Sequence, residues 1–459
     1  MPKRTPNTQL KDLLAEGKLT YESTARSVRA VAAELGEHLQ TNKSAVHHWV
    51  YGAVPDGLAA RCLAEALSRR LGRRITLNDL GLPSPTPGED DSIGLALGPD
   101  QDAVEVLMTI GEADVHRRRF LTASAYSMAA AVLPLGYVKE MAERTAAARG
   151  GAVIGAAEVS AVRDMVGLFA EMDERLGGQH GRAAFAQYLI TDIAPLCQAR
   201  FRNDDLRCQM LSVASSAAHL AGWKAYDSGE QGLAQRYYLQ SFALAVESGE
   251  PGQDGFVMRT MSQQGMKLHR PEHCLDLAAS GLARAHGQVP ARAQALFHIT
   301  HAHALAKTGQ RRQAVAEIDA ARAALDTGRG DQVPFWALAW GPPEATVVSR
   351  TAKVLEDLGD HRRASQYYAH AAASRPSGTY VRIVALDLVA AAESQLKQGS
   401  VEEACTTWSR AMDHMDGVAS ARTRKAVRNI RRNLAPYRCR GLRCAADLDE
   451  RATSFLTRV

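Results

Sequence analysis

The spacing of hydrophobic and polar positions predicts helices along most of this chain. Apolar residues recur three and four positions apart, and beyond residue 81 no alternating apolar and polar run indicates a strand of any length. Alanine is abundant and aromatic residues make up only 6% of the 459 positions, which favours closely packed helices over large sheets. We therefore expect an all-α fold.

A short helix with two distinct faces is expected at residues 43–51. At helical spacing Ala45, Val46 and Trp49 fall on one side, which can pack, whereas the opposite side is polar. Asn42 can cap the start of this helix, and a glycine at position 52 can end it. The polar side consists of Lys43, Ser44, His47, His48 and Tyr51.

Helices are also expected on both sides of this element, at residues 19–28 and 58–71. Several short helices around one small core fit a helix-turn-helix unit, in which one helix enters the major groove of DNA. An amphipathic helix that only packs and ends at a glycine gives the same pattern, so that alternative stays open.

If the unit binds DNA, the polar side of the central helix faces the groove. We expect Arg26, Arg29 and Lys43 to contact phosphates, and Asn42 to contact a phosphate or a base near the start of the helix. The complete set of candidate DNA-binding residues is Asn42, Lys43, Ser44, His47, His48, Tyr51, Arg26 and Arg29.

The order of these motifs resembles that of the Xre-type regulators of actinobacteria. The resemblance rests on S-x-V-x-x-W-x-x-G-x-x-P from Ser44, on A-L-S-R-R-L-G-R from Ala66 and on I-T-L-N-D-L-G from Ile75. In this family the pattern usually ends with a V-T-x-x-D-L-G-like run, to which the motif from Ile75 corresponds. The chain departs from the compact Xre pattern because the helix before the recognition helix continues to Leu35 and displaces the turn.

The resemblance implies a sequence-specific transcriptional regulator that binds double-stranded DNA. Similar proteins are negative regulators of sporulation and antibiotic production, which implies a repressor of development or secondary metabolism. One small head offers few contacts, so we expect a homodimer that binds half-sites about 10 base pairs apart. The alternative is a peptide- or protein-binding scaffold whose helical head does not bind DNA.

A proline-rich, acidic stretch at residues 82–95 is the clearest domain boundary. Its alternating prolines prevent a helix and favour an extended spacer. The predicted organisation is a helix-turn-helix domain at 1–81, the linker at 82–95, a helical region at 96–215 that joins or begins a solenoid, tetratricopeptide-like repeats at 216–417 and basic capping helices at 418–459.

Helix-breaking positions recur every 40 residues in the second half of the chain: Gly229, His269 and Gly309, then Gly359 and Gly399. Small residues follow each of them at fixed offsets and let a second helix lie close on the first. At the fifth position they are Ala234, Cys274, Ala314, Ala364 and Ala404, and at the twelfth Ser241, Gly281, Ala321, Ala371 and Ala411. Between these lie Tyr238, Ala278, Ile318, Tyr368 and Trp408.

This repeat is similar to the tetratricopeptide signature, stretched by longer helices or turns, and an insertion at 326–343 breaks its register as a long loop or a bend. Such a solenoid has a concave groove lined by the first helix of each pair. The groove candidates are His219, Trp223, Tyr226, Arg259, Gln263, His303, Lys353, Glu356 and Glu393. Their mixed charge and aromatic rings suit a peptide or protein ligand, whereas ordinary solvated positions or a small-molecule sensor are alternatives.

Nine basic residues and no acid lie between Asp416 and Asp447, at Arg422, Arg424, Lys425, Arg428, Arg431, Arg432, Arg438, Arg440 and Arg443. Apolar residues at helical spacing predict that this helix packs by one side and exposes arginine on the other. They are Ala426, Val427, Ile430 and Leu434. The helix can cap the solenoid, dock an acidic partner or add phosphate contacts.

Motifs for enzymatic chemistry are absent from the sequence. It holds no phosphate-binding glycine loop, no dinucleotide fingerprint, no H-E-x-x-H and no nucleophile elbow, so we expect neither an enzyme nor a cofactor. His298, His301 and His303 cluster, but on a helix His303 should point away from the other two, so no metal site is expected.

The remaining composition favours a cytoplasmic protein without a membrane segment. The net charge of +5 is mild, and the seven cysteines are odd in number and scattered, which argues against a disulfide framework. The chain starts without an apolar export signal. The segment from Arg117 to Leu135 is similar to a twin-arginine signal, but its internal position favours a buried helix.

Overall fold

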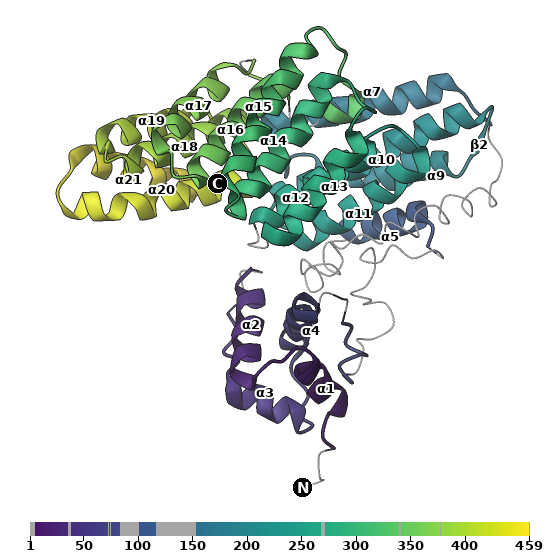
Figure 1. The fold of residues 1–459 in the computed structure, drawn as a ribbon, viewed down its shortest axis with the longest axis vertical. Coiled ribbons are helices and arrows are strands. Elements are labelled where there is room, and N and C mark those ends of the chain that lie inside the picture. The colour runs from purple at the N-terminus through teal and green to yellow at the C-terminus, as the bar shows by residue number, and fades with distance from the viewer. Residues whose placement is uncertain are drawn as a thin grey trace.

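The computed structural model confirms an all-α fold, with a small N-terminal head and a solenoid-like body (Figure 1). It describes residues 5–34, 38–71, 73, 75–82, 101–115, 153–267, 271–338, 341–376 and 378–458. The predicted linker beyond Leu82, the segment Arg117 to Leu135 and the predicted helix-breaking position His269 lie outside the described residues.

Four helices make up the head around one shared hydrophobic core. They are α1 (Thr8–Glu16), α2 (Tyr21–Glu34), α3 (Lys43–Val50) and α4 (Gly57–Leu71). Val28 of α2, Val46 of α3 and Leu63 and Leu67 of α4 are all inaccessible to solvent in that core. The apolar side of each helix therefore decides how the four pack together.

Hydrogen bonds of Asn7 connect the two ends of the head. Its Oδ1 caps α1 by accepting from the Leu10 backbone N–H at 2.9 Å, and its Nδ2 donates to the Leu80 carbonyl at 2.7 Å. Its own backbone N–H donates to the Val50 carbonyl at 2.9 Å. One residue thus connects the start of α1, the end of α3 and the segment that follows α4.

The body begins with a group of helices that lies before the hairpins. This group contains α5 (Ala103–Val115), α7 (Ala156–Leu176), α8 (Arg182–Tyr188), the π-helical turn η3 (Leu189–Ile193) and α9 (Ala194–Cys197). Two short strands, β1 (Val153–Ile154) and β2 (Arg200–Phe201), pair in parallel with Val153 opposite Arg200. A buried ion pair of 2.6 Å between Arg182 and Asp114 joins α8 to α5.

Six helical hairpins follow and stack along the body (Figure 1). They are α10 (Asp204–Asp227) with α11 (Gln231–Ser248), α12 (Gln253–Lys267) with α13 (Pro271–Ala285), α14 (Ala291–Lys307) with α15 (Arg311–Thr327), α16 (Pro343–Asp357) with α17 (His361–Ala373), α18 (Val381–Lys397) with α19 (Val401–Asp413), and α20 (Ala421–Cys439) with α21 (Arg443–Arg458). The first hairpin starts at Asp204, before the predicted start of the repeats at 216.

The small residues predicted from the repeat pattern lie where two helices meet. All five alanine and cysteine positions after the turns have no exposed surface, and the five bulky or small residues between the pairs are at most 4% exposed. Gly309 and Gly359 end the first helices of their pairs with φ of 80° and 84°, in the left-handed region that favours glycine. The local pattern therefore accounts for the close packing within the first five hairpins.

Within the predicted insertion at 326–343, residues 328–338 form a loop with a 3-10 turn, η4 (Phe335–Leu338), while residues 339 and 340 lie outside the described residues. Trp336 in this turn is 5% exposed, and its ring centroid lies 5.3 Å from that of Phe256 on α12. Burying this ring holds the loop against an earlier repeat.

Helix α7 packs against both α10 and α18, which belong to the first and fifth hairpins. The backbone continues this contact beyond the helix, because the Ala419 N–H donates to the Leu176 carbonyl at 2.8 Å and the Gln179 N–H donates to the Ala419 carbonyl at 3.2 Å. At Gly177 a Cβ atom would lie 2.4 Å from the Ala419 oxygen. Distant hairpins of the solenoid are thus joined through α7.

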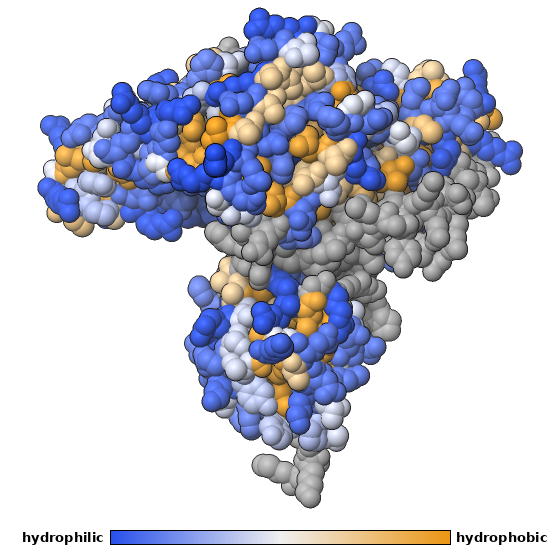
Figure 2. Space-filling model, viewed as in Figure 1, coloured by the Kyte–Doolittle hydropathy of each residue, from blue (hydrophilic) through white to orange (hydrophobic). Residues whose placement is uncertain are grey.

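Figure 2 shows hydrophilic residues over most of the visible head and body, with hydrophobic residues in narrower stripes between them. Among the described helices, none combines the length and the apolar character that a membrane span needs.

Candidate functional site

Helix α3 presents the polar face that the sequence predicts. Val46, Trp49 and Val50 are buried in the head, whereas the other side of the helix is open to solvent. The exposed residues are Lys43, Ser44, His47, His48 and Tyr51. The packed side holds the helix in place, so the five exposed side chains form one rigidly mounted surface.

Both ends of α3 are fixed by the residues expected there. Asn42 Oδ1 accepts from the Ala45 backbone N–H at 2.9 Å, and Gly52 follows the helix with a φ of 91°. Because Asn42 uses its carbonyl oxygen as the cap, its Nδ2 group is the part that can donate to a phosphate or a base.

Aromatic rings gather on the exposed side of α3. The ring centroids of His47 and Tyr51 lie 4.5 Å apart, and that of Tyr21 on α2 lies 5.8 Å from His47. Tyr51 is 54% exposed. These rings offer flat apolar surface and polar atoms to a partner at the same place.

The arginines on α2 differ in their surroundings. Arg26 is exposed, whereas Arg29 is partly buried and its Nη1 donates to the Thr41 carbonyl, which lies just before α3. Arg29 therefore positions the segment that leads into α3, and Arg26 is the freer of the two to meet a phosphate.

Eight positions separate the end of α2 at Glu34 from the start of α3 at Lys43. A helix-turn-helix has a turn of about three or four residues. The predicted displacement of this turn is therefore present, since α2 continues to Glu34.

The groove candidates occupy the first helices of the hairpins, but most of them are buried. His219, Trp223 and Tyr226 on α10 are between 5% and 7% exposed, and Arg259 on α12 is 1% exposed. Gln263 and His303 are also buried, while Lys353, Glu356 and Glu393 are partly exposed. The first-hairpin candidates are covered because α7 packs against α10.

Two of the buried candidates, His219 and His303, have polar partners within the protein. His219 Nε2 lies 2.9 Å from Thr260 Oγ1, and burial lowers the pKa of His219 to about 3, with Arg259 adding to the effect. His303 lies 3.1 Å from Asp357, whereas His298 and His301 both contact Glu317. His303 thus points away from the other two histidines, as predicted.

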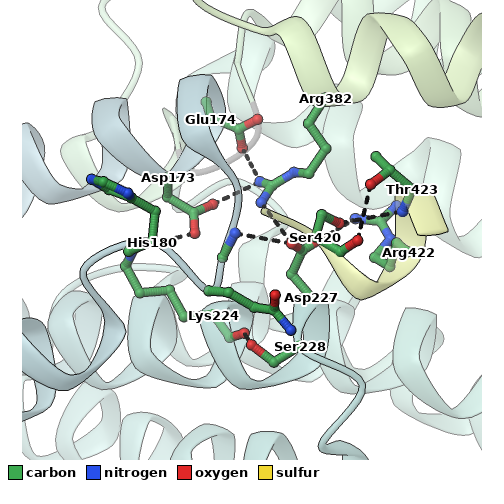
Figure 3. Close-up of polar contacts among 12 residues, drawn as sticks. Asp173, Glu174, His180, Lys224, Asp227, Ser228, Arg382, Ser420, Arg422 and Thr423 are labelled. Carbon is green, nitrogen blue, oxygen red and sulfur yellow. Dashed lines mark hydrogen bonds and ion pairs between the residues drawn. The ribbon is translucent and has the colours of Figure 1, made fainter. Parts of the chain in front are cut away.

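A cluster of buried charges lies where α7, α10, α18 and the start of α20 meet (Figure 3). Arg382 of α18 has no exposed surface, and its guanidinium lies 2.6 Å from Asp173, 3.3 Å from Glu174 and 3.2 Å from Asp227. Lys224 donates to Asp173 at 3.3 Å and to the His180 carbonyl at 3.2 Å. We call Asp173, Glu174, Lys224, Asp227, Arg382 and Arg422 the charge cluster.

The acids of the charge cluster differ in pKa. Burial raises the pKa of Glu174 to about 7, although the nearby Arg382 opposes the shift. Burial also acts to raise the pKa of Asp227, but Arg382 and Arg422 outweigh it and the net shift is downward. Asp227 is therefore held as a carboxylate, whereas Glu174 exchanges its proton near neutral pH.

Arg422 was expected on the exposed side of the basic C-terminal helix, and the structure places it inward. Its Nη1 lies 3.7 Å from Asp227, and its guanidinium lies 5.3 Å from the ring centroids of both Trp223 and Tyr226. Arg424 is also partly buried and donates to Gln179 Oε1 at 3.1 Å, whereas the apolar residues of α20 are buried as predicted.

The sequence analysis missed the other members of the charge cluster. Lys224 and Asp227 lie beside Trp223 and Tyr226 in the alanine-rich second half of α10, which is a signal for buried charge. Arg382 carries no such signal, because its partner Asp173 lies 209 positions away.

Comparison with known protein families matches residues 10–83 to the SP15 N-terminal domain. The match spans the described head from α1 to the segment after α4, and its description names a domain without an activity. No curated protein and no solved structure matches the chain.

Proposed function

We propose that this protein is a sequence-specific DNA-binding transcriptional regulator. The supporting observation is the exposed polar face of α3, capped by Asn42 and mounted on a packed four-helix head. A single exposed helix of this kind fits the major groove, where lysine and histidine donors can reach purine acceptors. By its resemblance to Xre-type regulators, the protein represses genes of development or secondary metabolism.

In this proposal the protein binds double-stranded DNA as a homodimer. One α3 offers few base contacts, and two heads on half-sites about 10 base pairs apart place both recognition helices on one side of the duplex. The body supplies the dimer contact and senses a ligand, peptide or protein partner in this proposal. Its repeats suit that role because a solenoid presents a long surface.

The test is capture of genomic DNA by the purified full-length protein, followed by gel-shift titration of the enriched fragment at two salt concentrations. The informative variant is Lys43→Ala combined with His47→Ala, since both side chains are exposed and outside the core. We expect a loss of about 1–3 kcal/mol per base contact and a shallower salt dependence, with unchanged helicity.

The matched control is Lys425→Ala combined with Arg428→Ala, which removes two exposed cations from α20 of the body. It should leave the preference for the enriched fragment unchanged. Weak, unspecific binding that salt abolishes in the unmodified protein, or equal losses in both double variants, would contradict specific recognition by α3.

The spacing between α2 and α3 favours a second candidate function. Eight positions between these helices exceed a compact helix-turn-helix turn, which suits a head that packs without reading DNA and a body that binds a peptide or protein. An enriched operator in the capture experiment excludes this candidate, and its absence favours it.

A further inference from the structure

A cavity of about 400 Å³ lies between α7 and the first two hairpins. Helix α7 lines one side, α10 and α12 line the other, and η4 with Tyr380 completes the wall. Its volume falls within the range of about 300–1,000 Å³ that is usual for pockets that bind small molecules. Glu171 in the lining is exposed, so this side of the cavity meets solvent.

Aromatic rings from three elements supply the apolar part of the lining. Trp223 comes from α10, Phe256 from α12 and Trp336 from η4. The rings of Phe256 and Trp336 pack with their centroids 5.3 Å apart, so the insertion after α15 builds part of this wall. Guanidiniums already lie over Trp223 and Phe256, so these rings offer apolar surface to a ligand and its charge must be met elsewhere in the lining.

The charged residues that line the cavity are all acidic in the described part of the chain. Glu171, Asp173 and Glu174 come from α7, and no lysine or arginine lines the space. Arg382 and Lys224 are not part of the lining, but both form ion pairs with Asp173 and offset its negative charge. Glu174 shares Arg382 with Asp173 at the longer distance of 3.3 Å, so its charge is the less compensated of the two.

Three buried oxygen atoms of the lining form no hydrogen bond within the described residues. Two are the carboxylate oxygens of Glu174, of which Oε1 lies 3.3 Å from Arg382 and Oε2 has no ion pair, and the third is Gln253 Oε1. Glu174 is 5% exposed and Gln253 is 1% exposed. The Gln253 amide nitrogen donates to the Ser212 carbonyl at 2.8 Å and to Ser216 Oγ at 3.1 Å, which fixes its orientation. Buried acceptors of this kind are costly unless a donor reaches them.

We propose that this cavity binds a small organic amine. Its apolar body lies among Trp223, Phe256 and Trp336, its ammonium group pairs with Glu174, and Gln253 Oε1 accepts a further N–H or O–H of the ligand. This inference specifies the ligand-sensing role in the proposed function, but amine binding is measured without DNA. Failure of DNA binding therefore leaves it standing, and the reverse also holds.

The test is calorimetric titration of the full-length protein near pH 8 with three probes that share one aromatic body. These are 2-phenylethylamine, 2-phenylethanol and 3-phenylpropionate. We expect the amine to bind about tenfold or more tightly than the alcohol, since a hydrogen bond to a charged group contributes about 1.5–3 kcal/mol, and the carboxylate to bind most weakly.

Two variants test separately the charge of Glu174 and the volume of the cavity. Glu174→Gln should weaken amine binding about tenfold and leave alcohol binding unchanged, whereas Glu402→Gln, at an exposed carboxylate on α19, should change neither. Gly167→Leu should abolish binding of both probes, because Gly167 lines the cavity and the nearest atom to an added Cβ, on Phe335, is 3.9 Å away.

The proposal is overturned if the alcohol binds as tightly as the amine, if Gly167→Leu leaves amine binding unchanged, or if none of the three probes binds at millimolar concentration. A cooperative melting transition in each variant checks that the fold is retained. Leucine in place of glycine within α7 raises the helix propensity at that position.

Discussion

At the scale of single residues, Glu174 is a buried carboxyl group whose pKa lies close to neutral pH. Burial raises its pKa to about 7 from an ordinary value of 4.5, and the carboxylates of Asp173 and Asp227 add to the shift. The guanidiniums of Arg382 and Arg422 oppose it. The folded protein therefore holds a proton on Glu174 between these two values, where the unfolded chain has already lost it.

The sign of the resulting stability effect follows from this proton. As pH rises from near 4.5 through about 7, the folded state must release the proton or bear a buried charge, so this residue contributes progressively less stability. Glu174→Gln cannot titrate. We predict that the variant is about as stable as the unmodified protein near pH 5 and more stable near pH 8, by up to about 3 kcal/mol.

Urea unfolding of both proteins at the two pH values measures this difference. Glu402→Gln on the surface of α19 is the control and should show no dependence of this kind. An advantage of Glu174→Gln that is the same at both pH values would mean that Glu174 does not titrate in this range.

At the scale of secondary-structure elements, the first five hairpins were predictable because the packing within each is local. Ala364 lies five residues after Gly359 and is completely buried between α16 and α17, while Tyr368 fills the space one turn later. A small residue at such a position is dictated by the approach of two helices that are neighbours in sequence. The repeat pattern in the sequence therefore carried the information.

Ala364→Leu tests this packing. The isobutyl side chain of leucine is too large for this buried position, so we predict a loss of about 1–3 kcal/mol in the free energy of unfolding. Ala369→Leu is the matched control, because Ala369 lies on the same helix and is exposed. Thermal melting of both variants measures the difference, and equal melting temperatures would show that the small positions do not control the approach of the helices.

The helix α20 marks where local prediction ends. Its packed side was predicted correctly, since Val427, Ile430 and Leu434 have no exposed surface. Arg422 was placed on the solvent side because helical spacing alone gives no information about Asp227, which belongs to the first hairpin. Periodicity predicts which side of a helix packs, and a distant partner decides which charged residue is drawn inward.

At the scale of the whole molecule, the predicted groove was partly wrong for the same reason, because contacts between distant segments decide which helices are covered. The sequence predicted which helices line the concave side, yet it gave no sign that α7 would cover α10 and reach α18. No repeat pattern links these segments, and the decisive pair, Asp173 and Arg382, is separated by 209 positions. The open groove of an idealised solenoid is thus partly replaced here by a cavity under α7.

For the same reason Arg382 holds distant parts of the body together. It connects α18 to Asp173 and Glu174 on α7 and to Asp227 at the end of α10, and it has no exposed surface. Arg382→Met leaves three buried carboxylates short of a counter-charge. We predict a loss of about 3–5 kcal/mol, which is typical when one partner of a buried ion pair is removed.

Hydrogen–deuterium exchange locates this loss. Faster exchange is expected in α7, α18 and α20 together, because the cluster joins these helices, while α12 to α15 should change less. Lys397→Met is the matched control on α18, since the Lys397 side chain is half exposed and its ion pair with Glu356 contributes about 1 kcal/mol or less. If Arg382→Met accelerates exchange only in the first turn of α18, the charge cluster does not hold α7 across the solenoid, and the helix is held instead by its packing against α10 and by the backbone hydrogen bonds of Leu176 and Gln179 to Ala419.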